Sequence, residues 1–437
     1  MVDLPVYFEQ RLVGTIDVDK RGPSFTYDAN WIGLRGAFPI STTMWFKSER
    51  IPSDTFLPWA ANLLPESEQL RTLGQVLGMA RGDVIGLLSA IGGDTAGALS
   101  VGQPGRTSSM RWRPVSTQEE LEKIIGDLPN KPFLVGEEGV SMSLAGAQAK
   151  LAVAVNEDGH IYIPMNGSPS THILKPDSPR LPGSVHNEAF CLTLVRRMKI
   201  PTPNVTTGHA GQRTYLLVKR YDRTDVSGRC RRLHQEDFCQ ALGKLPSAKY
   251  ECNYTGIQGP ALKDMFDVTR RHMAPTEIVR LLDMVIANVL VCNTDAHAKN
   301  YSIMIRGSGA SLAPMYDVMC GEVWENVTKN FAQKIAGKSR GDDLNGRDWQ
   351  RFARQCGLNP RQVIDRVGAL SGAAIAEAGV AQAEVAAMPA GNHAILDQTR
   401  QAVESRARAL LAQLQELRDV SAAVEAEGEA AEQVRLS

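Results

Sequence analysis

The chain has 437 residues, of which 43% are hydrophobic and 22% charged, as in a soluble globular protein of two or three domains. Lys plus Arg and Asp plus Glu both number 48, so no overall charge favours nucleic acid as a partner. The 7 cysteines form no CxxC pair, which argues against a zinc ribbon or a disulfide framework. The first residues show no signal-peptide pattern, so we expect a cytoplasmic protein without membrane contact.

Residues 1–110 are expected to form a first, mixed unit. Short strands are predicted at 6–18, 23–33 and 98–102, with an amphipathic helical region at 56–78.

Residues 111–233 are expected to form a β-rich lobe. The stretch SMSLAGAQAKLAVAVNEDGHIYIP, 141–164, predicts a strand, a turn of small residues and two further strands. A strand at THILKP, a helix at HNEAFCLTLVRRMK and a strand at GQRTYLLVKRYDR follow.

Residues 234–417 are expected to form a helical lobe, because apolar residues recur there every three to four positions. The helical segments include LHQEDFCQALG, ALKDMFDVTRRH, PTEIVRLLDMVIANVLVC and DWQRFARQCG. The Ala/Glu-rich tail, 418–437, has almost nothing to bury and is expected to be disordered. The fold class is therefore α+β, in an order typical of proteins that bind a nucleotide between two lobes.

The stretch NTDAHAKN follows a long apolar helix and places Asp295 and Asn300 five residues apart. Protein kinases space their catalytic Asp and metal-binding Asn in the same way. A carboxylate can accept the proton of an attacking hydroxyl, and an amide oxygen can bind Mg²⁺. Taken alone, the match is equally compatible with a solvated turn at a helix end.

Two further residues stand in the chain order in which protein kinases place their ATP-binding lysine and second metal-binding aspartate. Lys175 stands inside the apolar strand HILKP, where a kinase holds ATP phosphates, and Glu188 on the next helix could pair with it. A solvent-facing lysine on an edge strand is the alternative. Asp317, in APMYDVMC, follows a predicted hairpin and could be the second metal ligand, although the motif is no DFG.

The small residues of SLAGAQAK, 143–150, would let backbone N–H groups approach phosphates. The stretch has one glycine and fits neither a Walker A nor a G-x-G-x-x-G pattern, so a plain tight turn is the alternative.

Together, SLAGAQAK, THILK, VHNEAFCL, VKRYDR, HQEDFCQALG, NTDAHAKN and MYDV resemble the HipA-like serine/threonine kinase toxins. The resemblance runs from about residue 5 to about residue 410. It implies a kinase-like two-lobed core preceded by an N-terminal subdomain, with ATP and Mg²⁺ as cofactors.

The resemblance implies a role for each matching position. Asp295 would be the catalytic base, and Asn300 and Asp317 would hold Mg²⁺. The ATP-binding residues would be Ala145, Gly146, Ala147, Gln148, Lys150, Lys175, Lys219, Arg220, Tyr221, His297, Asn300 and Asp317. Lys219 to Tyr221 would be the hinge that meets adenine. Lys299 has no assigned role.

The resemblance also implies regulation and partners. Ser143 would be autophosphorylated and the modified loop would leave the ATP site, with Ser141 as a nearby alternative acceptor. The protein substrate would be an aminoacyl-tRNA synthetase, whose phosphorylation halts translation and growth and gives persistence. A HipB-like helix-turn-helix antitoxin would bind the kinase and operator DNA together. Arg351 and Arg354 could touch that DNA, or could lie on a solvated helix face.

Two other classes of function remain open from the sequence. A lipid or small-molecule kinase shares the same divergent core, but no basic amphipathic membrane helix is visible. A co-repressor pseudokinase acting with a DNA-binding partner would need none of the catalytic residues that this chain retains.

Overall fold

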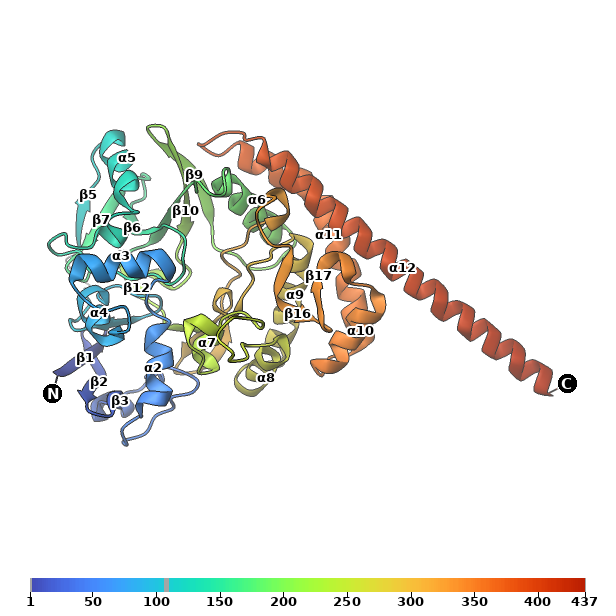
Figure 1. The fold of residues 1–437 in the computed structure, drawn as a ribbon, viewed down its shortest axis with the longest axis horizontal. Helices are drawn as coiled ribbons and strands as arrows, with labels where there is room; N and C mark the ends of the chain where they lie inside the picture. The colour runs from blue at the N-terminus through green and yellow to red at the C-terminus, as the bar shows by residue number, and fades with distance from the viewer. Residues whose placement is uncertain (1, 106–109, 437) are drawn as a thin grey trace.

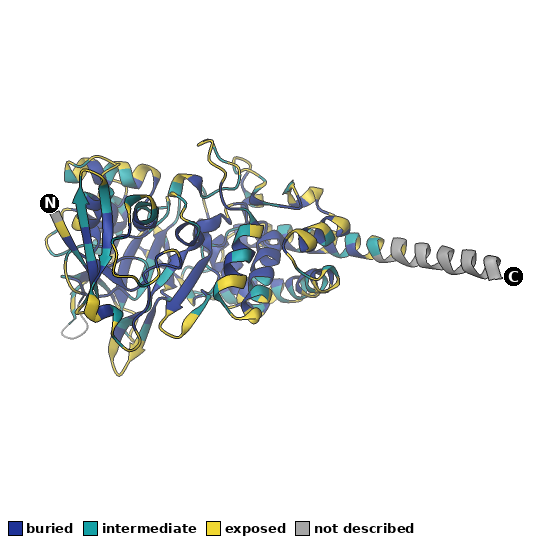
Figure 2. Cartoon of the chain, turned by 90° about the horizontal axis from the view of Figure 1, so that it is seen from below, coloured by how far each residue is buried: buried dark blue, intermediate teal, exposed yellow. Residues whose placement is uncertain are grey.

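The computed structural model describes residues 2–105 and 110–436, and from residue 420 onward only the backbone. Figure 1 shows an N-terminal unit packed against a β-rich lobe, with a helical lobe beside them. Buried residues run through the strands and helices of all three, and the buried apolar side chains form one continuous cluster (Figure 2). The three parts therefore share a core.

The N-terminal unit is an antiparallel sheet in the order β3-β2-β1-β4 with helices packed on it. Its strands are β1 Val2–Phe8, β2 Arg11–Asp19, β3 Gly22–Tyr27 and β4 Leu99–Val101. Its helices are α1 Ala29–Ile32, α2 Ser53–Ala61, α3 Ser67–Leu77 and α4 Val84–Ile91. Phe25 on β3 stacks on Phe56 of α2 with ring centroids 5.7 Å apart, which joins sheet to helix.

The β-rich lobe is a six-stranded sheet in the order β5-β7-β6-β8-β10-β9. Its strands are β5 Arg111–Pro114, β6 Leu151–Val155, β7 Ile161–Met165, β8 His172–Pro176, β9 Val205–Ala210 and β10 Arg213–Lys219. Helices α5 Gln118–Asp127 and α6 Ser184–Arg197 pack against it. The hairpin of β11 Arg223–Val226 and β12 Arg229–Arg232 follows. The strands predicted at THILKP and GQRTYLLVKRYDR are confirmed as β8 and β10.

The strand predicted before the small-residue turn, at 141–144, is wrong: no strand is assigned there. This segment bonds to loops of the N-terminal unit instead of to a neighbouring strand. The N–H of Ser143 donates to the Asp94 carbonyl at 3.0 Å, and its hydroxyl donates to the Leu63 carbonyl at 2.7 Å. Those contacts satisfy the backbone without a ladder.

The helical lobe contains most of the predicted helices. They are α7 Phe238–Ala241, α8 Leu262–His272, α9 Pro275–Leu290, α10 Gly346–Gln355, α11 Pro360–Ala386 and α12 Ile395–Leu436. Two small sheets complete it: β13 Gln235–Asp237 with β14 Ser302–Arg306 and β15 Gly309–Leu312, and β16 Asn330–Ile335 with β17 Lys338–Arg340. The stretch LHQEDFCQALG therefore contains strand β13 and a single helical turn, where one helix was predicted.

Helix α12 is assigned as far as Leu436, and the disorder expected for 418–437 stays a prediction. Ala and Glu are strong helix formers, which favours extension of a helix even without apolar residues to bury. Within the described part of the chain, no helix is long and apolar enough to cross a membrane.

Candidate active site

A cavity of about 1310 Å³ lies between the β-rich lobe and the helical lobe and brings the predicted site residues together. Its volume is ample for a nucleotide. The cavity is lined by Ala145, Gly146, Ala147, Gln148, Lys150, Lys175, Glu188, Lys219, Arg220, Tyr221, Asp295, His297, Asn300 and Asp317. Ser143, Arg351 and Arg354 are not among its lining residues.

Lys175 lies on an interior strand, because β8 pairs with β6 on one side and β10 on the other. Its Nζ donates to Oε1 of Glu188 at 2.7 Å and to Oδ1 of Asp317 at 2.5 Å. Burial alone would lower the pKa of Lys175, but the two carboxylates outweigh it and raise the pKa well above its ordinary value. The lysine is therefore charged and points into the cavity, which excludes the solvent-facing edge position.

Asp317 follows the β14–β15 hairpin with φ +57°, a left-handed conformation that costs energy for a residue with a side chain. Burial would raise the pKa of Asp317, but the ammonium groups of Lys175 and Lys150 hold it well below its usual range. The strained backbone thus presents an ionised carboxylate to the cavity, beside the lysine pair.

The loop from Ala145 to Lys150 is closed by a hydrogen bond from the side chain of its last residue to the backbone of its first. The Nζ of Lys150 donates to the Ala145 carbonyl at 2.7 Å, and burial lowers its pKa to about 8. Gly146 has φ +105°, and a Cβ there would lie 2.7 Å from that Nζ. Glycine is required at this position for both backbone and space.

Helix α3 of the N-terminal unit holds the outer side of this loop. The N–H of Glu66 donates to the Gly146 carbonyl at 3.1 Å. The side-chain amide of Gln69 donates to the carbonyls of Ala147, at 2.9 Å, and Gln148. The N-terminal unit therefore shapes the cavity wall. Neither Glu66 nor Gln69 was predicted, because no local pattern marks a contact between segments so far apart in sequence.

The loop after α9 fixes Asp295 and Asn300. Asn293 is held by Asn288 of α9 at 2.8 Å, and its side-chain oxygen accepts from the N–H of Asp295 at 3.1 Å. The side-chain N–H of Asn300 donates to the Asp295 carbonyl at 2.7 Å. The five-residue spacing thus closes a hydrogen-bonded turn whose carboxylate, 56% exposed, faces the cavity.

Lys299 lines the cavity, but its ammonium group is committed to protein side chains. Its side chain is 2% exposed, and Nζ donates to Oδ1 of Asn62 at 2.7 Å and Oδ2 of Asp237 at 3.1 Å. Asn62 ends helix α2 of the N-terminal unit. Lys299 therefore anchors the loop to the N-terminal unit.

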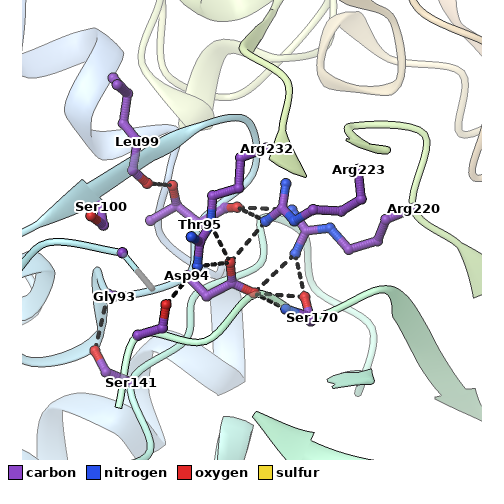
Figure 3. A network of polar contacts seen from close by, with 12 residues as sticks. Gly93, Asp94, Thr95, Leu99, Ser100, Ser141, Ser170, Arg220, Arg223 and Arg232 are labelled. Carbon is purple, nitrogen blue, oxygen red and sulfur yellow. Dashed lines mark hydrogen bonds and ion pairs between the residues drawn. The ribbon is translucent and has the colours of Figure 1, made fainter. Parts of the chain in front are cut away.

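The segment Lys219–Tyr221 lines the cavity, but the Arg220 side chain turns away from it. Figure 3 shows Arg220, Arg223 and Arg232 converging on Asp94 of the N-terminal unit. Arg220 also pairs with Asp222 at 2.7 Å. Its guanidinium is thus committed to a buried network. Its backbone N–H donates to the Thr171 carbonyl at 2.9 Å, so its own carbonyl is the group left for a ligand.

The two predicted regulatory features lie outside the cavity. Ser143 is 0% exposed and faces the N-terminal unit. Ser141 donates to the Ala90 carbonyl at 3.1 Å. Arg351 and Arg354 are exposed on α10, and Arg351 pairs with Asp348 at 3.1 Å. Phosphorylation of Ser143 would require the loop to move.

The donor set of the cavity fits a hard cation bound together with phosphate. Asp317 supplies carboxylate oxygens and Asn300 an amide oxygen, the ligands that Mg²⁺ takes alongside phosphate oxygens and water. No group of three or more His, Cys, Asp or Glu side chains suited to a metal occurs among the described residues.

A β-rich lobe and a helical lobe enclosing a Lys–Glu pair, a loop Asp–Asn pair and a second Asp define a kinase-like two-lobed fold. Comparison with known proteins agrees. The family model of the HipA-like C-terminal domain matches residues 142–378, and that of the HipA N-terminal domain matches residues 4–102. The chain belongs to the HipA family.

Individual relatives cover most of the chain. Kinase Y4mE of Sinorhizobium fredii is 35% identical over 375 residues, 83% of this chain and 88% of its own. The serine/threonine-protein kinase toxin HipA of Shewanella oneidensis is 30% identical over 345 residues, 76% of this chain and 78% of its own. A solved complex of Shewanella oneidensis HipA, HipB and operator DNA matches with a TM-score of 0.82 at 27% identity, covering 95% of this chain and 99% of that chain.

Proposed function

We propose that this chain is an ATP-dependent serine/threonine protein kinase acting as a toxin. The observation that carries the proposal is the convergence, in one cavity, of the buried Lys175–Glu188 pair, Asp317 and the exposed carboxylate of Asp295. A co-repressor without activity would have no need of this charged, strained arrangement.

Each group has a role in phosphoryl transfer. Lys175 and Lys150 would hold ATP phosphates, and the backbone of Ala145 to Gln148 would cradle them. Asn300 and Asp317 would hold Mg²⁺, which supplies neutralising charge for the phosphate oxygens when bound. Asp295 would accept the proton of the acceptor hydroxyl. The backbone of Lys219–Tyr221 would meet adenine.

The partners in this proposal follow from the relatives. The matched Shewanella complex contains HipB and operator DNA, so a HipB-like antitoxin and its operator are the proposed partners here, with Arg351 and Arg354 on α10 as candidate DNA contacts. The proposed substrate is an aminoacyl-tRNA synthetase, whose phosphorylation would stop growth. Phosphorylation of Ser143 would end activity, since a phosphate of about −1.5 to −2 charge does not fit the fully buried position of this hydroxyl and the loop would have to leave its place.

The test is incubation of the purified chain with γ-labelled ATP and Mg²⁺, alone and with cell extract. We expect label on Ser143 and on one extract protein. Asp295→Ala and Asp317→Ala should each lower transfer by about 10²- to 10⁴-fold, because one removes the base and the other a metal ligand. Asp158→Ala, at an exposed position, is the matched control.

Undiminished transfer in Asp295→Ala would refute the assignment of the base. Label on Ser141 in place of Ser143, read by mass spectrometry, would move the self-inactivation site. An unlabelled wild-type chain whose intact mass shows no phosphate would favour the co-repressor function.

A further inference from the structure

Tyr250 touches the catalytic carboxylate although no sequence motif contains it. The residue follows the helical turn Pro246–Ala248 and leads into a segment that is exposed at 254–258. Its hydroxyl donates to Oδ1 of Asp295 at 2.5 Å. A contact this short to a charged acceptor is among the stronger hydrogen bonds in proteins.

The polarity of this hydrogen bond is fixed. Burial and the neighbouring Asp295 carboxylate raise the pKa of Tyr250 well above its ordinary value, so the phenol stays protonated and donates. His297 lies with Nε2 4.0 Å from the same oxygen, but burial lowers its pKa to about 4, so it is neutral at physiological pH. The phenol is thus the donor to Oδ1.

The Tyr250 ring is itself held on two sides. Its edge meets the His297 ring with centroids 5.1 Å apart, and the Lys249 ammonium lies 5.4 Å from its centroid. Lys249 is in turn tied to Oε2 of Glu66 at 2.7 Å, and its carbonyl accepts from the N–H of Ala298 at 3.2 Å. Tyr250 is therefore fixed against the loop that carries Asp295 by contacts on two sides of its ring.

The other polar side chains of the loop that carries Asp295 form no hydrogen bond to its carboxylate. Lys299 is bound to Asn62 and Asp237, and Asn300 donates to the Asp295 backbone carbonyl. Among the described residues, Oδ2 of Asp295 accepts no hydrogen bond, whereas Oδ1 is taken by Tyr250. One oxygen of this cavity-lining carboxylate is anchored, and the other is left to accept a proton.

We propose that Tyr250 is a positioning residue that holds Oδ1 so that Oδ2 meets the acceptor hydroxyl. The inference rests on the proposed kinase activity. During transfer the acceptor oxygen bonds to the γ-phosphorus, the bond to the ADP oxygen breaks, and the acceptor proton passes to Oδ2. A base oriented by a third group is the arrangement that activates hydroxyl nucleophiles.

The test is Tyr250→Phe, which keeps the ring against His297 and removes the donor. We measure label transfer from γ-labelled ATP with Mg²⁺ to the chain itself and to myelin basic protein as a generic acceptor. The rate constant at saturating ATP should fall roughly tenfold to a hundredfold, as for loss of a hydrogen bond to a charged group. The KM for ATP should change by less than about twofold, since Tyr250 touches Asp295 and the acceptor side.

Two comparisons separate positioning from a structural role. Tyr254→Phe, on the same segment and 108% exposed, should transfer at the wild-type rate. Tyr250→Phe added to Asp295→Asn should cause no further loss, because Tyr250 acts through that carboxylate. Unchanged melting temperatures would exclude misfolding as the cause.

Three outcomes would overturn the inference. A wild-type rate in Tyr250→Phe would mean that the hydrogen bond to Asp295 does not contribute to transfer. A faster rate would mean that the hydroxyl blocks the acceptor. An additive loss in the double variant would place the effect of Tyr250 elsewhere. Absence of label in a wild-type chain whose intact mass shows no phosphate would instead refute the kinase itself, and the role of Tyr250 with it.

Discussion

At the scale of single residues, buried ionisable side chains fall into two kinds. Those at the cavity stay charged beside groups of opposite charge, and those without such a partner become neutral. Lys175 keeps its charge between two carboxylates, and Asp317 keeps its charge between two ammonium groups. Among the described residues, Glu236 has no such ion-pair partner, and its Oε2 accepts no hydrogen bond. It is 1% exposed, and its Oε1 accepts from the N–H and hydroxyl of Thr42 at 2.8 and 2.6 Å.

Burial raises the pKa of Glu236 from 4.5 to about 7. The folded chain therefore binds more protons than the unfolded chain between these pH values, and this group's contribution to stability is lost as pH rises from about 4.5 through 7. Glu236→Gln should stabilise the fold at pH 8 by about 1–3 kcal/mol and hardly at all at pH 4.5. Urea unfolding at both pH values measures this.

The control is Glu157→Gln, at an exposed position, which should leave stability unchanged at both pH values. Equal stabilisation by Glu236→Gln at pH 4.5 and pH 8 would mean that charge is not the cause.

At the scale of elements, each loop of the cavity is positioned by a helix that supplies no chemistry. Helix α9 sets Asp295 through Asn288 and Asn293, whereas α3 holds the loop 145–150 from outside. Periodicity predicted α9 and a helical region around α3. It could not predict that the first turn of α3 reaches a loop almost eighty residues away, since such a contact depends on how the units pack.

Gln69→Ala should weaken ATP binding by about fivefold to thirtyfold, the loss of one to two hydrogen bonds that seat the loop. Compared at equal occupancy by ATP, the rate of Ser143 self-labelling should be higher in the variant than in the wild-type chain. The reason is that a loop held less firmly exposes the serine more often. Calorimetric ATP titration and label transfer measure the two effects. Gln362→Ala, exposed on α11 and not among the residues that line the cavity, is the control, and an equal loss there would rule out a specific role for Gln69.

At the scale of the whole molecule, the N-terminal unit is joined to the kinase-like core by a buried charge network. Asp94 is 2% exposed and lies 2.8 Å from Arg223, 3.0 Å from Arg232 and 3.5 Å from Arg220 (Figure 3). It also accepts from the hydroxyl of Ser170 at 2.6 Å. This carboxylate neutralises three buried guanidinium groups, and Asp222 is the second carboxylate beside them.

Asp94→Asn should therefore destabilise the chain by about 3–5 kcal/mol, the usual result of leaving buried charges uncompensated. Chemical denaturation of the two proteins gives the difference. Asp19→Asn, which removes the surface partner of Arg50, should leave the stability nearly unchanged, because exposed ion pairs contribute little. A loss below 1 kcal/mol in Asp94→Asn would show that water or a rearranged Asp222 satisfies the arginines.

The sequence by itself determined the elements with strong local patterns: strands β8 and β10, helices α6 and α9, and the spacing that places Asp295 and Asn300 on one turn. These depend on contacts a few residues apart, which periodicity and motif spacing record. It failed where long-range contacts replaced local ones, at the missing strand before residue 145 and the short strand β13.

Only the tertiary structure decided which groups orient the site. Lys299 anchors to Asn62, Gln69 holds the loop 145–150, and Tyr250 holds Asp295, each across tens to hundreds of residues of chain. Such partners are chosen by packing of the N-terminal unit and both lobes around one core. No local pattern encodes them, because the same residue types form solvated turns and helix faces wherever that packing is absent.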